Sequence, residues 1–151
     1  MTILETLESL GYFMTKSELF SGKFMGAVQV GNLVYTAGQV SSWKGVDIKG
    51  KVGADVSLEQ GYQAARFCAL NCIQAAHSLV GVESLSRVIK ILGMVNIAPG
   101  FDNTPGVIHG ASDLINTVFG EAGHHARSAV GMVIPFNYAV EVEAIFEIRQ
   151  R

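Results

Sequence analysis

One arginine carries the clearest chemical signal in this sequence. Residues 126–135 alternate as a β-strand does, and Arg127 shares one face with Ala129, Gly131 and Val133. Neighbours along a strand point to opposite faces, so only small or apolar side chains stand beside the guanidinium. The pattern indicates a pocket with a fixed cation, whose planar fork of donors matches a carboxylate. The alternative is an arginine at a strand end with its head in water.

Two carboxylates stand two residues apart on the last predicted strand, Glu141 and Glu143. A carboxylate in a site can order a water molecule or carry a proton. The alternative is a solvated or cross-strand-paired face, which we favour for Glu143 and Glu147. Glu141 follows Arg127 across a short hairpin that contains Pro135. We expect both side chains on the sheet face opposite the helices, where they would be neighbours.

The histidines and the tryptophan give weaker signals. His124 and His125 are adjacent and point apart in an extended segment, which makes a poor metal pair without a third ligand. His77 is late in a predicted helix and is expected to be structural. His109 could be exposed or line a site, and Trp43 could cover a pocket or a subunit contact. Nucleotide-binding loops and the serine-hydrolase elbow are missing, so we expect no metal and no cofactor.

Length and composition fit one ordinary domain over residues 1–151, of which 49% are apolar. The net charge of -2 gives no sign of a nucleic-acid or membrane partner. No apolar run is long enough to span a bilayer, and the first residues lack the order of a signal peptide. Cys68 and Cys72 have helical spacing, which favours buried free thiols. A cytoplasmic protein is expected.

The elements that must position these residues follow from hydrophobic period and turn signals. Ser57 to Gln60 has the form of a capping box, and Gly81 ends the helix that it opens. The predicted order is a short helix over 1–11, strands 24–30 and 33–37, a loop 41–53, a helix 57–80, a strand 88–98, a helix 105–121, and strands 127–134 and 138–148. Two helices therefore serve one mixed sheet, an α+β fold in which one sheet face must be covered by something else.

Several segments together resemble the RidA/YjgF family of reactive-intermediate deaminases. They are Gly31–Gln39, Gly50–Val56, Ala126–Ser128, Pro135 and Val140–Ile145. The resemblance covers about residues 22–148. It implies a chorismate-mutase-like fold assembled as a homotrimer, with the uncovered sheet faces around the threefold axis and ligand sites between subunits. The helical segment before it, residues 1–21, looks like an extension found in a longer branch of the family.

The resemblance also implies a chemistry and its residues. Family members hydrolyse small imines and enamines to 2-oxo acids and ammonia, without a cofactor. The matching arginine, Arg127, clamps the substrate carboxylate, and Glu141 inherits the role linked to water. Gly38 supplies a close backbone approach. Positions that line the family site hold other residues here: Phe24 for a Tyr, Ala37 for a Ser, Ala129 for a Cys, and Ser112 as the nearest counterpart of an Asn.

Three functions are consistent with these residues. The first is an imine or enamine deaminase, in which Arg127 and Glu141 suffice because an iminium carbon is already electrophilic and needs one positioned water. The second is a trimer of the same family that binds a small carboxylate or 2-oxo acid without catalysis, as the apolar replacements favour. The third, an endoribonuclease, is disfavoured by the acidic balance and by the lack of a basic, aromatic-rich surface.

Overall fold

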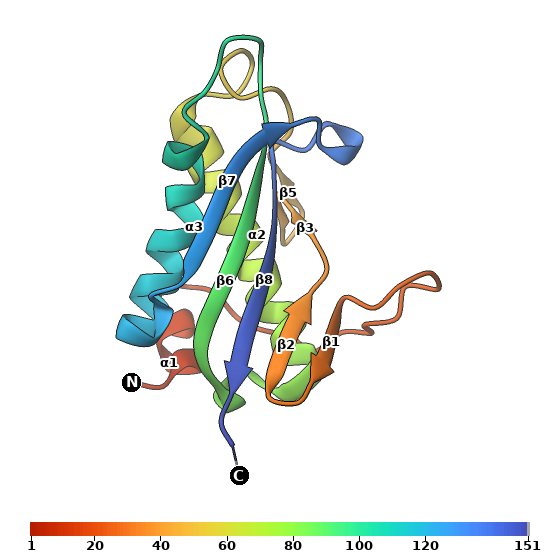
Figure 1. The fold of residues 1–151 in the computed structure, drawn as a ribbon, viewed down its shortest axis with the longest axis vertical. Coiled ribbons are helices and arrows are strands. Elements are labelled where there is room, and N and C mark those ends of the chain that lie inside the picture. Colours follow the sequence, from red (N-terminus) through yellow and green to blue (C-terminus); the bar gives the residue numbers. More distant parts are fainter. Residues whose placement is uncertain (151) are drawn as a thin grey trace.

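Two helices cover one face of a mixed β-sheet and leave the other face open (Figure 1). The computed structural model describes residues 1–150. Its main elements are α1 (Ile3–Ser9), β1 (Ala27–Val30), β2 (Leu33–Thr36), β3 (Gln39–Val40), α2 (Leu58–Val80), β6 (Leu85–Asn96), α3 (Thr104–Phe119), β7 (Ala126–Met132) and β8 (Val140–Ile148). Short strands β4 (Ser42–Trp43) and β5 (Val46–Asp47) pair with each other, and 3-10 turns occupy Val82–Ser84, Gly120–Gly123 and Pro135–Asn137.

The sheet has the order β1-β2-β8-β6-β7, and β3 pairs with β8 beside β2. β6 and β7 run parallel, and the other pairs are antiparallel. A parallel pair needs a crossover, which α3 supplies between β6 and β7. The predicted α+β architecture of the chorismate-mutase-like type is confirmed, and the predicted order of its main elements agrees with the structure.

The core lies between the sheet and the two long helices. Ser57 accepts a hydrogen bond from Gln60 N and donates its own N–H to Gln60 Oε1, so the predicted capping box opens α2. Along β8 the buried row is Val140, Val142, Ala144 and Phe146, as the alternation predicted. Cys68 and Cys72 are free and fully buried under this row. These contacts fix which face of β8 points away from the helices.

Four local expectations differ from the structure. Residues 24–26 precede β1 rather than extending it, and the loop 41–53 contains the small β4-β5 hairpin. Trp43 is only 8% exposed and packs edge-on against Tyr12, with ring centroids 6.5 Å apart, so it belongs to the core and covers no pocket. The other strand and helix ends shift by one to three residues, which is normal for boundaries judged from periodicity.

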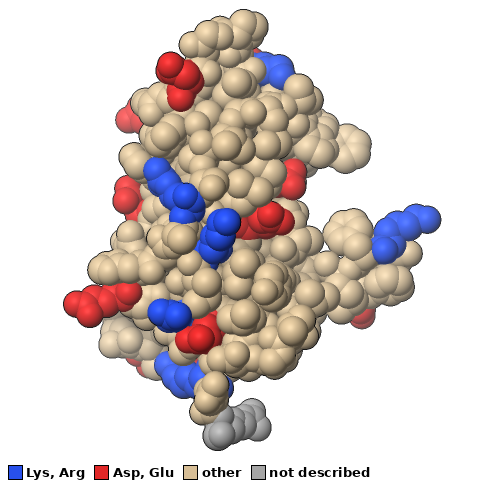
Figure 2. Space-filling view, in the orientation of Figure 1, with Lys and Arg blue, Asp and Glu red and all other residues tan. Residues whose placement is uncertain are grey.

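The uncovered sheet face carries exposed apolar side chains at both edges of the sheet. Figures 1 and 2 look onto this face, and charged side chains of both signs are scattered there among wide uncharged areas. Its exposed apolar side chains come from both edges of the sheet: Val28, Val30, Tyr35, Val130 and Met132. No helix within residues 1–150 has the length and apolar character needed to cross a bilayer.

Candidate active site

Arg127 points toward α3, not toward the uncovered face. Its register partner on β6 is Ile91, which in turn pairs with Ala144 on β8, and both partners are buried under the helices. Residues paired across a ladder project to the same face of the sheet. Arg127 is therefore on the helix-covered side of the edge strand β7, where its head meets one end of α3 rather than open water.

Two side chains of α3 hold the guanidinium at one nitrogen. Nη1 donates to His109 Nδ1 at 2.9 Å and to Ser112 Oγ at 3.1 Å. Nη2 makes a longer contact of 3.4 Å with the Pro105 carbonyl at the start of the helix. His109 and Ser112 are three residues apart, which brings both onto one helix face. Arg127 is half-buried by these contacts.

A second histidine extends this cluster. His125 Nε2 lies 2.9 Å from Ser112 Oγ, and its Nδ1 lies 2.6 Å from the Gly123 carbonyl. A carbonyl only accepts, so Nδ1 carries a proton and donates to it. We call Arg127, His109, Ser112 and His125 the arginine cluster. In residues 1–150 no carboxylate lies within salt-bridge distance of Arg127, and the ion pair found there joins Arg87 to Glu147 at 3.2 Å.

Glu141 lies elsewhere, on the uncovered face. It pairs with Met94 on β6 and with Val40 on β3. A Cβ added to Gly38 would fall 2.0 Å from Glu141 Oε2, so the carboxylate in its present position rests directly against the backbone of Gly38. Partial burial, and secondarily the charge of Glu143, raises the pKa of Glu141 above its usual range. A raised pKa suits a carboxylate that exchanges protons nearer neutral pH.

The expectation that Arg127 and Glu141 are neighbours on one face is wrong within a single chain. β6 lies between β7 and β8, so these strands do not form a hairpin. Met94 pairs with Val130 on one side and with Glu141 on the other, and Val130 is an odd number of residues from Arg127. The two functional candidates therefore project to opposite faces of the sheet.

The other predicted site residues divide between these two places. Ser112 contacts Arg127 directly, and Ala129 shares its strand face, with the Ala129 carbonyl accepting from Thr104 Oγ1. Ala37 precedes Gly38 and donates its N–H to the Gly26 carbonyl. Phe24, two residues before Gly26, is 61% exposed. The candidate residues thus fall into two groups, one at β7 and α3 and one around Gly38 and Glu141, which we call the two candidate half-sites.

Sequence reasoning left open whether His109 is exposed or lines a site, and it assigned no role to His125. His125 was considered as half of a metal pair with His124, yet its ring is engaged by Ser112 and a carbonyl. Within residues 1–150 no three His, Cys, Asp or Glu side chains gather as a metal site would require. The three-residue spacing of His109 and Ser112 on a predicted helix was the one sequence signal that could have placed these two side chains together.

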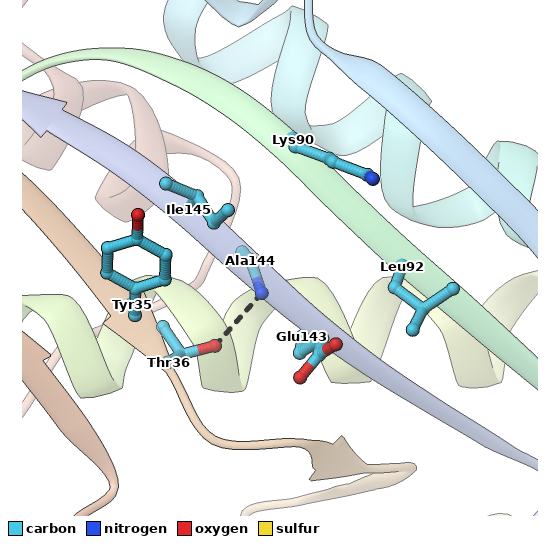
Figure 3. Close-up of a pocket in the computed structure, with 7 residues that line it drawn as sticks. All are labelled: Tyr35, Thr36, Lys90, Leu92, Glu143, Ala144 and Ile145. Carbon is cyan, nitrogen blue, oxygen red and sulfur yellow. Dashed lines mark hydrogen bonds between the residues drawn. The ribbon is translucent and has the colours of Figure 1, made fainter.

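A hollow of about 290 Å³ opens on the uncovered face, beside the residues around Glu141 and away from Arg127 (Figure 3). Glu143 lines it with Lys90, Leu92 and Tyr35, and Thr36 Oγ1 accepts a hydrogen bond of 3.0 Å from Ala144 N at its floor. Glu143 is exposed, and Glu147 pairs with Arg87 across the β6-β8 ladder. These two carboxylates therefore agree with the expected solvated or cross-strand-paired face.

The fold defines the class: an α+β chain whose helices cover one side of a mixed sheet, with Arg127 on the edge strand and no carboxylate of residues 1–150 paired with it. The sequence matches the family described as "YjgF/chorismate_mutase-like, putative endoribonuclease" over residues 10–148. Protein TCP17 of Trypanosoma cruzi is 35% identical over 150 residues, which cover 97% of this chain and 94% of that protein. The chain belongs to the YjgF/chorismate mutase-like family.

Solved structures agree with this assignment. Atu1372 from Agrobacterium tumefaciens superposes with a TM-score of 0.88 at 37% identity, covering 99% of this chain and 94% of that one. A structure from Shewanella oneidensis, described as a putative endoribonuclease, superposes with a TM-score of 0.90 at 28% identity, covering 98% of this chain and all of the other. Both cover the N-terminal helical segment as well as the sheet, so that segment is part of the shared fold.

Proposed function

We propose that this chain hydrolyses small imine or enamine acids to 2-oxo acids and ammonia, with Arg127 as the clamp for the substrate carboxylate. The observation that carries the proposal is the state of Arg127. Its guanidinium is half-buried and held at Nη1 by His109 and Ser112, and no carboxylate of residues 1–150 neutralises it. A positioned cation without an internal counterion suits an anionic ligand, and its fork suits a carboxylate.

The chemistry needs few groups beyond this clamp. A protonated imine carbon is electrophilic, and water adds to it while a proton leaves the attacking water for Glu141. Glu141 returns this proton to the nitrogen of the resulting carbinolamine, and the C–N bond then breaks with departure of ammonia. The carbinolamine hydroxyl gives its proton to the Glu141 carboxylate as the carbonyl of the 2-oxo acid forms, and this proton passes to the ammonia, which leaves as ammonium. The raised pKa of Glu141 favours this exchange, because acid–base catalysis works best with a pKa near the working pH.

The two half-sites lie on opposite sheet faces, so the proposed cleft needs a second copy of the chain. One copy supplies the arginine cluster, and its neighbour supplies Glu141 with the backbone at Gly38. A homotrimer, as the family resemblance implies, would also cover the apolar open face that carries Val130 and Tyr35. In this arrangement Phe24, Ala37 and Ala129 make the cleft more apolar than polar side chains at these positions would.

Ammonia release from 2-iminopropionate tests the proposal. An amino-acid oxidase generates the imine from alanine, and the rate above the spontaneous rate is measured for the wild type, Arg127→Ala and Glu141→Gln. Arg87→Ala is the matched control, because Arg87 is an exposed arginine paired with Glu147. We expect acceleration by the wild type and the control and none by the other two. No acceleration by the wild type, or equal rates from wild type and Arg127→Ala, refutes the proposal.

Binding without catalysis is the second candidate, and the apolar side chains at 24, 37 and 129 favour it. A trimer of this kind would bind a small carboxylate or 2-oxo acid as a sensor. Saturable, Arg127-dependent binding of 2-oxobutanoate with no ammonia release would select this alternative. Ribonuclease activity, which the family description names, has no support in the charge pattern, because the chain carries a net charge of -2 and its open face mixes both signs.

A further inference from the structure

The arginine cluster leaves only one edge of the guanidinium for a ligand. A guanidinium has five N–H donors, two of them on Nη1. Both Nη1 hydrogens are taken, by His109 Nδ1 and by Ser112 Oγ. The Pro105 carbonyl takes one hydrogen of Nη2. Nε has no partner within residues 1–150, so the Nε–H and the second Nη2 hydrogen are the donors left for a bidentate carboxylate.

This arrangement fixes the tautomer of His109. Arginine stays protonated and only donates, so Nδ1 of His109 must be the acceptor. The imidazole is then neutral, with its proton on Nε2. If Nδ1 gained a proton, the contact at 2.9 Å would join two donors and two positive charges. Ser112 would then be the remaining side chain that holds Nη1, and that nitrogen would regain a free hydrogen.

Within residues 1–150 no carboxylate makes an ion pair or a hydrogen bond with His109. Arg127 faces it from β7, and His125, just before β7, is turned to Ser112 and the Gly123 carbonyl. Asp113 follows on α3 itself, but Tyr62 of α2 donates to its carboxylate at 2.7 Å. The charged side chain in hydrogen-bond contact with His109 is thus a cation, Arg127, and not a carboxylate.

We propose that His109 is a positioning residue whose neutral imidazole aims Arg127, so that the Nε–Nη2 edge meets the substrate carboxylate and protonation of His109 releases that aim. This inference rests on the proposed function and adds that the orientation of Arg127 depends on the protonation state of His109. His109 touches Arg127 rather than the reacting atoms. Histidine is the side chain that changes charge between pH 5 and 8, so carboxylate binding weakens over that interval as pH falls.

Calorimetric binding of 2-oxobutanoate at pH 8 and pH 5 tests the proposal in the assembled protein. Asparagine can place an acceptor oxygen where Nδ1 lies and cannot be protonated. We expect His109→Asn to bind within about threefold of the wild type at pH 8 and His109→Ala about tenfold more weakly. Between pH 8 and pH 5 the wild type should weaken about tenfold more than His109→Asn does. The control His124→Asn changes an exposed neighbouring histidine and should behave as the wild type.

Each failure has a distinct signature. Equal binding by wild type and Arg127→Ala refutes the proposed function, whatever the histidine variants do. Two outcomes overturn the role of His109 and leave the proposed function standing, provided that binding depends on Arg127. One is the same pH dependence in the wild type and in His109→Asn, and the other is tighter wild-type binding at pH 5 than at pH 8. Long-range ¹H–¹⁵N spectra of ¹⁵N-histidine-labelled protein without ligand give an independent readout. The Nε2–H tautomer of His109 at pH 8 supports the proposal, and the Nδ1–H tautomer overturns it.

Discussion

Gly38 offers a direct perturbation of the second half-site. Its backbone lies against Glu141, and the ideal position of an added Cβ is 2.0 Å from Oε2 and 2.9 Å from the carboxyl carbon. Gly38 is not among the residues with positive φ, so alanine fits the local backbone conformation. The clash is with the end of a flexible side chain, which can move aside. Gly38→Ala should therefore displace the Glu141 carboxylate by more than about 1 Å without unfolding the chain.

The expected effect is a loss of rate with little loss of stability. Misplacing a catalytic group by about 1 Å can cost on the order of a hundredfold in rate. We expect Gly38→Ala to lower the rate of ammonia release from 2-iminopropionate by about tenfold to a hundredfold. The melting temperature should stay within about 3 °C of the wild type, because a flexible carboxylate absorbs the clash. Size-exclusion chromatography of both proteins checks that the assembly is retained.

A double-mutant cycle separates this explanation from a general disturbance of β3. In Glu141→Ala the carboxylate that meets the new Cβ is absent and turnover is already lost, so the cycle is measured in stability. Gly38→Ala should lower the stability no further in that background. Two results contradict the reasoning. One is full activity in Gly38→Ala. The other is an equal loss of stability in both backgrounds, which would place the defect in the backbone of the segment 37–40 and not in Glu141.

Three further predictions follow from particular contacts. Gly110→Ala should lower the free energy of unfolding by about 2 kcal/mol, because its Cβ would lie 1.9 Å from the backbone oxygen of Tyr62 where α3 crosses α2. Urea unfolding measures this change, and unchanged stability would contradict the close approach of the two helices. Native protein should resist thiol reagents, with labelling that appears only on unfolding, because burial raises the pKa of Cys68 and raises that of Cys72 to about 12. Because the pKa of Glu141 is raised in the folded state, protonated Glu141 favours the folded chain below the unfolded-state pKa, and this stabilisation is lost as the pH rises through the folded-state pKa. Glu141→Gln should therefore have a higher melting temperature than the wild type at pH 8 and should lose this advantage at pH 4. Turnover by Glu141→Gln should be abolished at both pH values.

The architecture could be predicted from local sequence because several signals agree. The Ser57–Gln60 capping box, the small residues along α2 and the alternation of β8 all specify one packing arrangement. The N-terminal helix likewise follows from its spacing and its own cap at Thr2. Trp43 was misjudged because a loop position says nothing about which side chains reach back. It packs on Tyr12, 31 residues away, in a contact that no local pattern encodes.

The candidate site was harder to predict because alternation identifies residues that share a face but not which face it is. Both rows of β7 consist mostly of small or apolar residues, so the sequence does not show which row faces the helices. The face is set by β6, whose Ile91 is Arg127's partner. His109 and Arg127 come from separate elements 18 residues apart, and their contact depends on how α3 crosses back over β7.

The same register argues that the proposed chemistry belongs to an assembly and not to one chain. Arg127 and Glu141 are fixed on opposite faces by continuous ladders, β7 with β6 and β6 with β8. A loop movement cannot bring them together, because exchanging faces would require a one-residue slip of a whole strand and would turn its buried row outward. A second copy needs no such change. The open face already exposes apolar side chains at both edges of the sheet, which a second copy can cover. Dissociated subunits should therefore lose turnover while the arginine cluster within each stays intact.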